Sequence, residues 1–181
     1  GKQLNEIDEI SGPDKFLPHL LGHEGVGEVV EISNKVTKVK IGDRVVVHWR
    51  PGKGLSPSPA TFTNHKFDIN AGPTTTFSEF TVVCESRVTK IPESLSSNIS
   101  ALLGCALTTS YGVVFNDAKA KPGQCIVIFG AGGVGLSTLL MAKLANLSPI
   151  VMIDIDEKKL DISRKIGADF SILFKSSSQV I

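Results

Sequence analysis

A glycine-rich segment in the C-terminal half of the chain has the residue types and spacing to bind a nucleotide. Gly130, Gly132 and Gly135 form the pattern G-x-G-x-x-G between the apolar runs IVIF and VGLSTLLMAKLA. After a strand and before a helix, such glycines permit a tight turn, the approach of a pyrophosphate to the backbone, and close helix–strand packing. Gly133 and Val134 begin the expected helix, whose free N–H groups would face the phosphates. The segment therefore predicts a dinucleotide-binding turn.

An acidic residue follows this turn at the expected distance. Asp154 lies 19 residues after Gly135, close to the ~20 typical of a carboxylate that binds the adenosine ribose. Asp156 and Glu157 add negative charge where the 2′-phosphate of NADP would lie, so the segment favours NAD. A glycine turn that only connects a strand to a helix is the alternative, and the register of strand, helix and Asp154 argues against it.

A second group of residues has the chemistry of a metal site. His23 and Glu24 stand among closely spaced glycines in the segment LGHEGVG, and Cys105 lies in the segment GCALTTSYG. A neutral imidazole is a good zinc ligand, and a neighbouring carboxylate can bind the metal or orient a ligand. For a histidine taken alone, a structural role is the alternative interpretation. The remaining histidines and cysteines have no partner pattern, and we expect structural or surface roles for them: His19, His48, His65, Cys84 and Cys125.

Together these segments resemble the medium-chain, zinc-dependent alcohol dehydrogenase family. That family carries GHE early, then a segment like G-C-x-x-T-[TS]-x-x-G, then GxGGVG, and this chain has all three in order together with the turn GDRV. The resemblance implies that His23 and Cys105 are two ligands of a catalytic zinc ion, with Glu24 as the exchangeable neighbour. It further implies that Thr109 contacts the nicotinamide side of NAD and that Lys159 lies near the adenosine ribose.

Two features depart from the family pattern. The first zinc ligand of the family is a cysteine followed by Gly-x-Asp, whereas this chain begins Gly1-Lys2-Gln3. Gln3 therefore stands where an Asp is expected, and Lys2 where a proton-relay Ser or Thr is expected. Residues 50–76 contain none of the four cysteines with which many relatives bind a structural zinc, so we expect one catalytic zinc and no structural zinc. We also expect the chain to be a fragment, truncated at both ends.

The elements that would position these residues change in character near residue 95. Before it, valine-rich runs broken by turn residues predict strands within residues 25–33, 34–43, 44–49 and 77–92. Residues 50–76 are predicted to form a long surface loop, and residues 96–118 a helical stretch. Strands and helices then alternate, which implies a parallel sheet with crossover helices over residues 125–129, 134–145, 149–153, 157–166 and 170–174.

The family resemblance and this pattern give one expected fold, of the class α/β plus β. A GroES-like β-barrel catalytic domain would occupy residues 1–118, with 96–118 as its helical connection. The first half of a Rossmann NAD-binding domain would follow over residues 119–181.

The composition excludes several functional classes. The chain has 181 residues, of which 41% are hydrophobic and 20% charged, and its net charge is +1. No electrostatic attraction to nucleic acid or to a membrane surface is expected, and the apolar runs are too short to span a bilayer. The three cysteines are odd in number and widely spaced, which indicates reduced thiols and a cytoplasmic protein.

We therefore expect an oxidoreductase that transfers hydride between NAD and an alcohol or polyol, with zinc polarising the substrate oxygen. Its partner would be a small-molecule alcohol or carbonyl compound, and we expect the intact protein to be a homo-oligomer. One alternative is a zinc-free quinone or enoyl reductase of the same superfamily. Those enzymes usually lack the GHE pair and the cysteine, and they generally prefer NADPH. The other alternative is an inactive dinucleotide-binding pseudoenzyme, which Lys2 and Gln3 favour.

Overall fold

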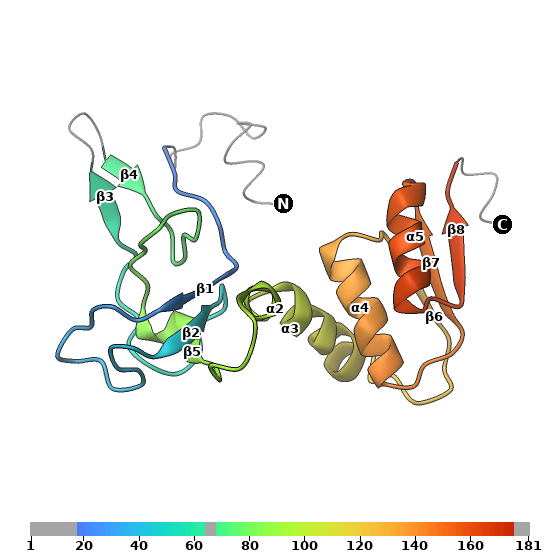
Figure 1. The fold of residues 1–181 in the computed structure, drawn as a ribbon, viewed down its shortest axis with the longest axis horizontal. Helices are drawn as coiled ribbons and strands as arrows, with labels where there is room; N and C mark the ends of the chain where they lie inside the picture. The colour runs from blue at the N-terminus through green and yellow to red at the C-terminus, as the bar shows by residue number, and fades with distance from the viewer. Residues whose placement is uncertain (1–17, 64–67, 176–181) are drawn as a thin grey trace. The chain divides into compact units, whose positions relative to one another are not determined.

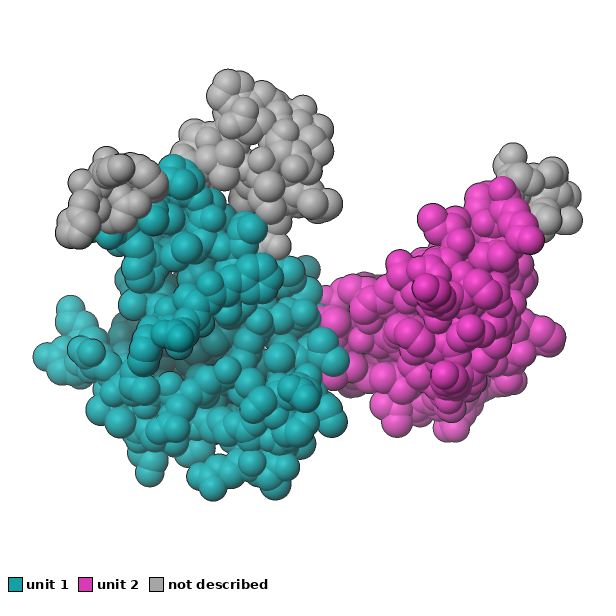
Figure 2. Space-filling model, turned by 45° about the horizontal axis from the view of Figure 1, so that its top comes forward, with its two compact units in different colours: residues 1–105 teal, residues 106–181 magenta. Residues whose placement is uncertain are grey.

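The chain divides after Cys105 into two compact units, unit 1 (Gly1–Cys105) and unit 2 (Ala106–Ile181), which are coloured separately in Figure 2. The computed structural model describes residues 18–63 and 68–175. The predictions for Lys2, Gln3 and His65 lie outside the described residues. Within residues 18–63 and 68–175, no helix is both long and apolar enough to cross a membrane.

The central sheet of unit 1 contains three antiparallel strands in the order β1-β2-β5 (Figure 1). These are β1 (Gly25–Glu28), β2 (Arg44–Val47) and β5 (Val88–Lys90). Val47, at the end of β2, pairs with Gly25 of β1 and with Val88 of β5. The apolar cluster around this sheet is small and consists of the buried valines Val39, Val45, Val47 and Val88.

The other elements of unit 1 are short. β3 (Thr61–Thr63) and β4 (Asp68–Asn70) pair as a separate antiparallel hairpin. A 3₁₀ helix, η1 (Glu85–Arg87), leads directly into β5. Helix α2 (Ser97–Leu102) begins after Ser96, whose hydroxyl accepts a hydrogen bond from Ile99 N at 3.4 Å. This hydroxyl satisfies one of the N–H groups that the first turn of a helix leaves without a partner.

Three predictions for unit 1 were wrong in whole or in part. Of residues 77–92, expected to contain a strand along the run, only Val88–Lys90 form one, and Glu85–Arg87 form a 3₁₀ helix. Residues 34–43 form turns and irregular backbone, not a strand. The reason is that Thr37 N and Lys38 N donate to the Glu85 carboxylate, at 2.6 and 2.5 Å, and not to a neighbouring strand. Residues 50–76, expected to be a loop, contain the β3–β4 hairpin. Its described strands have three residues each, which is too short for an alternating pattern to be recognised in the sequence.

The sheet of unit 2 is parallel and has the order β6-β7-β8 (Figure 1). Its strands are β6 (Ile126–Phe129), β7 (Ile150–Asp154) and β8 (Phe170–Leu173). The crossover helices are α4 (Gly133–Leu144) and α5 (Glu157–Ile166). The predicted order of strands and helices is confirmed, with element ends that differ by one residue or not at all.

The compact unit boundary lies at residue 105, whereas the sequence predicted a domain boundary after residue 118. The intervening residues form α3 (Ala106–Tyr111) and the π-helix η2 (Gly112–Asp117). Ser110 Oγ lies 3.0 Å from Val134 O in the first turn of α4, and Thr138 donates to Ser110 Oγ at 3.1 Å. Val114 is fully buried in the core of unit 2. These contacts attach the predicted helical connection to the sheet and helices of unit 2.

The core of unit 2 lies between its sheet and its helices. Burial of apolar surface stabilises the folded state by roughly 25 cal/mol per Å². The buried apolar cluster of unit 2 is larger than that of unit 1, and we expect it to be the main source of stability in unit 2. Its buried members are Val114, Ile128, Ala131, Leu139, Ala142, Ala145, Leu147, Ile150, Met152 and Leu160.

Candidate functional site

The glycine-rich turn has the backbone geometry that its sequence pattern requires. Gly130 has a φ of +95°, and its N–H donates to Ile153 O at 2.7 Å. A Cβ atom at Gly135 would lie 1.8 Å from Gly130 O, so only glycine can occupy the position where α4 meets β6. At Gly132 and Gly133 a Cβ would have no heavy atom within 4 Å. The backbone is therefore open at the start of α4, and this cradle fits the pyrophosphate of a dinucleotide.

Asp154 lies at the end of β7 and faces the same turn. Its Oδ2 atom accepts a hydrogen bond from Ala131 N at 2.5 Å, and its Oδ1 atom accepts one from Asp156 N at 2.8 Å. The hydrogen bond from Ala131, followed by that from Asp156, lowers the pKa of this carboxyl, and the nearby positive charge of Lys159 contributes less. Asp154 is therefore negatively charged at neutral pH.

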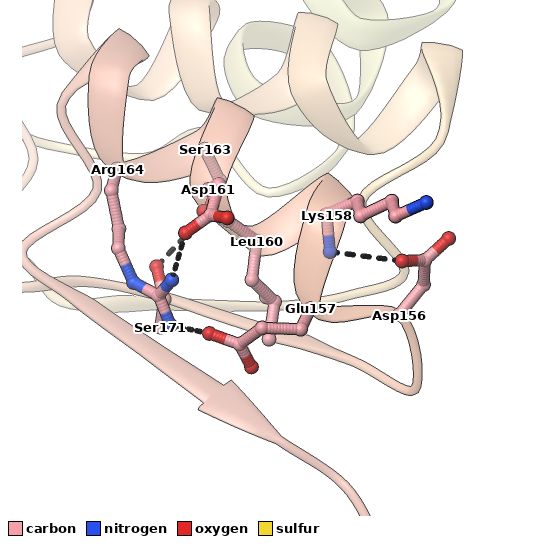
Figure 3. Close-up of polar contacts among 8 residues, drawn as sticks. All are labelled: Asp156, Glu157, Lys158, Leu160, Asp161, Ser163, Arg164 and Ser171. Atoms are coloured by element: carbon pink, nitrogen blue, oxygen red, sulfur yellow. Dashed lines mark hydrogen bonds and ion pairs between the residues drawn. The ribbon is translucent and has the colours of Figure 1, made fainter.

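The charges at the start of α5 are partly balanced by one another (Figure 3). Asp156 accepts a hydrogen bond from Lys158 N at 2.9 Å and so caps the helix. Arg164 forms ion pairs with Glu157 at 2.7 Å and with Asp161 at 2.6 Å, and the hydrogen bond with Glu157 is the main cause of the raised pKa of Arg164. Of the acidic residues expected to repel a 2′-phosphate, Glu157 is thus paired with Arg164.

The segment that carries His23 and Glu24 leads directly into β1, and its backbone is hydrogen-bonded to residues 76–77. Thr76 Oγ1 donates to Glu24 O at 2.8 Å, while Thr76 N and Phe77 N both donate to Leu21 O, at 3.2 and 3.1 Å. His23 and Glu24 are half-buried. These bonds hold the backbone on both sides of His23 against residues 76–77.

Cys105 lies in the turn between α2 and α3 and is half-buried. The preceding residue, Gly104, is buried against β2, because a Cβ at this position would lie 2.3 Å from Val47 O. Val47 also pairs with Gly25, which follows His23-Glu24. The segment that carries His23 and the turn that carries Cys105 therefore both contact the end of β2.

His23 and Cys105 have the side-chain chemistry of zinc ligands, but they are fewer than a catalytic zinc site requires. An imidazole and a thiolate are preferred zinc donors, and a catalytic zinc needs three protein ligands. Among residues 18–63 and 68–175, no group of three or more His, Cys, Asp or Glu side chains is placed to hold a metal ion. The described part of the chain therefore does not complete a metal site by itself.

Thr109, the residue expected to lie near the nicotinamide, is exposed on α3. Sequence reasoning missed its neighbour Ser110, which is completely buried. Ser110 Oγ also lies 2.8 Å from Ala106 O, and Thr138 Oγ1 lies 2.8 Å from Val134 O. This polar group fixes α3 against the first turn of α4. The signal available was the run of three hydroxyl residues TTS in an otherwise apolar helix.

A second missed residue is Glu85, a buried carboxylate in unit 1. In addition to its bonds from Thr37 N and Lys38 N, it accepts a hydrogen bond from Leu55 N at 2.8 Å. The bond from Leu55 is the first of the backbone hydrogen bonds that lower the pKa of Glu85. Two loops far apart in sequence are thus held by one charged group. The available signal was a single acidic residue inside the run TVVCESRV.

Comparison with known proteins gives a consistent family. Residues 4–93 match the alcohol dehydrogenase GroES-like domain family. The chain is 36% identical over 185 residues to S-(hydroxymethyl)glutathione dehydrogenase of Escherichia coli O139:H28, in an alignment that covers 86% of this chain and 49% of that protein. The chain therefore spans about half the length of the curated relatives it matches.

Solved structures share the fold. Benzyl alcohol dehydrogenase from Acinetobacter calcoaceticus is 28% identical, with a TM-score of 0.78 over 95% of this chain and 52% of that protein. A quinone oxidoreductase from Pseudomonas syringae is 27% identical, with a TM-score of 0.68 over 88% of this chain and 42% of that protein. The expected fold, a GroES-like domain followed by a Rossmann-type parallel sheet, is confirmed.

Proposed function

Because the chain belongs to the medium-chain, zinc-dependent alcohol dehydrogenase family, we propose that the protein is an oxidoreductase that transfers hydride between NAD and the carbon of an alcohol or polyol. The aldehyde or ketone would be the product of the forward reaction. The observation that carries this proposal is the open glycine-rich turn facing the charged carboxylate of Asp154.

Each part of this turn has a role in the proposed NAD site. The free N–H groups at Gly132, Gly133 and Val134 would bind the pyrophosphate at the start of α4. Asp154 would accept hydrogen bonds from the adenosine ribose, with Lys159 beside it, and its negative charge would repel the 2′-phosphate of NADP. Bound NAD supplies the hydride acceptor. The protein's own contribution is to hold the dinucleotide in one orientation.

We assign zinc to His23 and Cys105, with Glu24 as the neighbouring carboxylate. The half-buried positions of the two donors and their shared contact with the end of β2 support this assignment. A third protein ligand would come from outside the described residues, so no reaction step is derived through the metal. As in the family, one catalytic ion is proposed and no structural zinc, because residues 50–76 contain no cysteine.

The substrate is proposed to be a small alcohol or carbonyl compound. The names of two relatives reported above give substrates of this kind: S-(hydroxymethyl)glutathione for one and benzyl alcohol for the other. We further propose that the complete protein is a cytoplasmic homo-oligomer. A quinone-reductase activity is the second candidate because of the likeness to the Pseudomonas syringae enzyme, but His23, Cys105 and Asp154 favour the alcohol dehydrogenase chemistry.

The test measures zinc content and cofactor use in the full-length protein. We expect bound zinc, tighter binding of NADH than of NADPH, and NAD-dependent oxidation of simple alcohols. His23→Ala and Cys105→Ser should lose zinc and activity, whereas Cys125→Ser, an exposed cysteine outside the proposed site, should retain both. NADH binding with neither zinc nor alcohol oxidation would support the inactive pseudoenzyme instead. Zinc-free activity on quinones with NADPH would support the second candidate.

A further inference from the structure

The carboxylate of Asp154 has backbone partners on both of its oxygens before any ligand is bound. Oδ2 accepts from Ala131 N, inside the glycine-rich turn, and Oδ1 accepts from Asp156 N, at the start of α5. The preceding residue, Ile153, holds the adjacent position of the turn by accepting from Gly130 N. Two consecutive residues at the end of β7 therefore bind two consecutive amides of the turn.

We propose that Asp154 is a positioning residue that holds the glycine-rich turn in its open, phosphate-binding conformation, in addition to any contact with the ribose. This inference rests on the proposed dinucleotide site. It differs from a ribose contact because its expected effect is on pyrophosphate binding, transmitted through Ala131 N of the turn.

The surroundings of Ala131 explain why the turn needs this acceptor. Ala131 is 1% exposed, so its N–H group is shielded from water. It lies between Gly130, with its φ of +95°, and Gly132, which caps α4. The carboxylate supplies the partner that this buried N–H group needs. A hydrogen bond to a charged acceptor is also stronger than one to a neutral acceptor.

The ribose and the turn can share this carboxylate. Each carboxylate oxygen has two acceptor positions, and the backbone amides occupy one on each. Ribose hydroxyls could therefore bind without releasing Ala131 N. In the carboxylate, Ala131 N and Asp156 N bond to different oxygens. An asparagine at position 154 has an oxygen at only one of these two places, so it keeps the bond from one amide and loses the other. Its NH₂ group would face the other N–H group.

The experiment separates the two roles with a pair of ligands. Binding of ADP and of 2′,3′-dideoxy-ADP to the full-length protein is measured by calorimetry for the wild type and for Asp154→Asn. Dideoxy-ADP has the pyrophosphate but no ribose hydroxyls. We expect Asp154→Asn to weaken dideoxy-ADP binding about tenfold, the loss of one charge-assisted hydrogen bond, and ADP binding by at least as much. Removing a negative charge would by itself strengthen binding of an anion, so charge cannot produce this loss.

The contrary result is equally specific. If Asp154→Asn weakens ADP binding and leaves dideoxy-ADP binding unchanged, Asp154 contacts the ribose only and the inference is wrong. If the wild type binds neither ligand, the proposed dinucleotide site fails as well. Asp161→Asn, an identical chemical change on the exposed side of α5, is the matched control and should leave both affinities within about twofold.

Circular dichroism and thermal melting establish whether Asp154→Asn folds. Should it not, Asp154→Glu takes its place, since glutamate keeps the charge and both acceptor oxygens but displaces them by one methylene. The inference expects this variant to bind dideoxy-ADP more weakly than the wild type. Unchanged binding of dideoxy-ADP in Asp154→Glu would contradict it.

Discussion

In unit 2 the central contacts are between apolar side chains of a sheet and its crossover helices, whereas in unit 1 charged groups hold much of the backbone in place. The buried apolar cluster of unit 2 has ten members and that of unit 1 has four. In unit 1 two further buried positions belong to carboxylates, Glu85 and Asp43. Glu85 binds three backbone amides, and Asp43 accepts from Lys90 Nζ at 2.5 Å and from Lys40 N at 3.1 Å.

This difference predicts two kinds of stability in one chain. Burial of apolar surface does not depend on protonation, but a carboxylate that accepts hydrogen bonds loses acceptor capacity when it is protonated. Mutations in unit 2 should therefore act through packing, and mutations in unit 1 through charge. The tests that follow compare the two units.

The largest effect is expected in the core of unit 2. Leu139 of α4 is fully buried, so Leu139→Ala should lower the free energy of unfolding by about 2–5 kcal/mol through lost apolar contacts and a residual cavity. Urea unfolding followed by circular dichroism measures it. Leu140→Ala, one position along the same helix and 42% exposed, is the control and should have a much smaller effect. Equal losses in the two variants would contradict the assigned core.

A smaller but localised effect is expected from Glu85→Gln in unit 1. The amide has one acceptor oxygen and cannot serve Thr37 N, Lys38 N and Leu55 N together. Residues 34–40 and 52–57 should become more sensitive to limited proteolysis. The fluorescence of Trp49, the single tryptophan of this sequence, should report earlier unfolding of unit 1. Glu79→Gln, an exposed glutamate of the same unit, should leave both readouts unchanged.

The same pair of variants gives a pH test. The hydrogen bonds from Leu55, Lys38 and Thr37 lower the folded pKa of Glu85. Its stabilising contribution is therefore present above the unfolded pKa, about 4.3, and is lost as the pH falls through the lower, folded value. The stability difference between wild type and Glu85→Gln should be constant near neutral pH and shrink below about pH 4. A difference that grows on acidification would overturn this account.

The smallest effect is expected on the surface of α5, where Arg164 is paired with Glu157 and Asp161 (Figure 3). All three side chains are substantially exposed, and exposed ion pairs contribute little because water and salt screen them. Arg164→Ala should shift the melting temperature less than any variant above, and high salt should reduce the shift further. Lys165→Ala on the same helix is the control. A large shift in the melting temperature that does not depend on salt would contradict the small contribution expected from these two ion pairs.

The sequence predicted unit 2 far better than unit 1, for a physical reason. In unit 2 each strand and helix has its own periodicity, so local patterns locate β6, α4, β7, α5 and β8 to within a residue. In unit 1 the path of residues 34–43 depends on Glu85, 48 positions away from Thr37. No local pattern at Thr37 indicates that its N–H group will bond to a distant carboxylate.

In the candidate site, too, sequence patterns predicted some features and missed others. Spacing alone located the glycine-rich turn and placed Asp154 at the end of the next strand. It did not predict that Ala131 N donates to Asp154, since that bond depends on the direction of a side chain. Ser110 was missed for the same reason, because two of its partners, Val134 and Thr138, lie on another helix. Sequence patterns thus indicate which backbone comes to the site, but not which side chains hold it there.

The bonds of Glu85 also determine the order in which the chain can become structured during synthesis. Lys38 leaves the ribosome 47 residues before its acceptor, so its N–H group must remain hydrated until residue 85 has emerged. Closure of so long a segment loses chain entropy before any contact compensates, and such non-local pairing folds slowly. In unit 2 the strand residue Ile126 needs to wait only for Ile150. The first half of the chain to be made therefore has the longer delay between synthesis and closure.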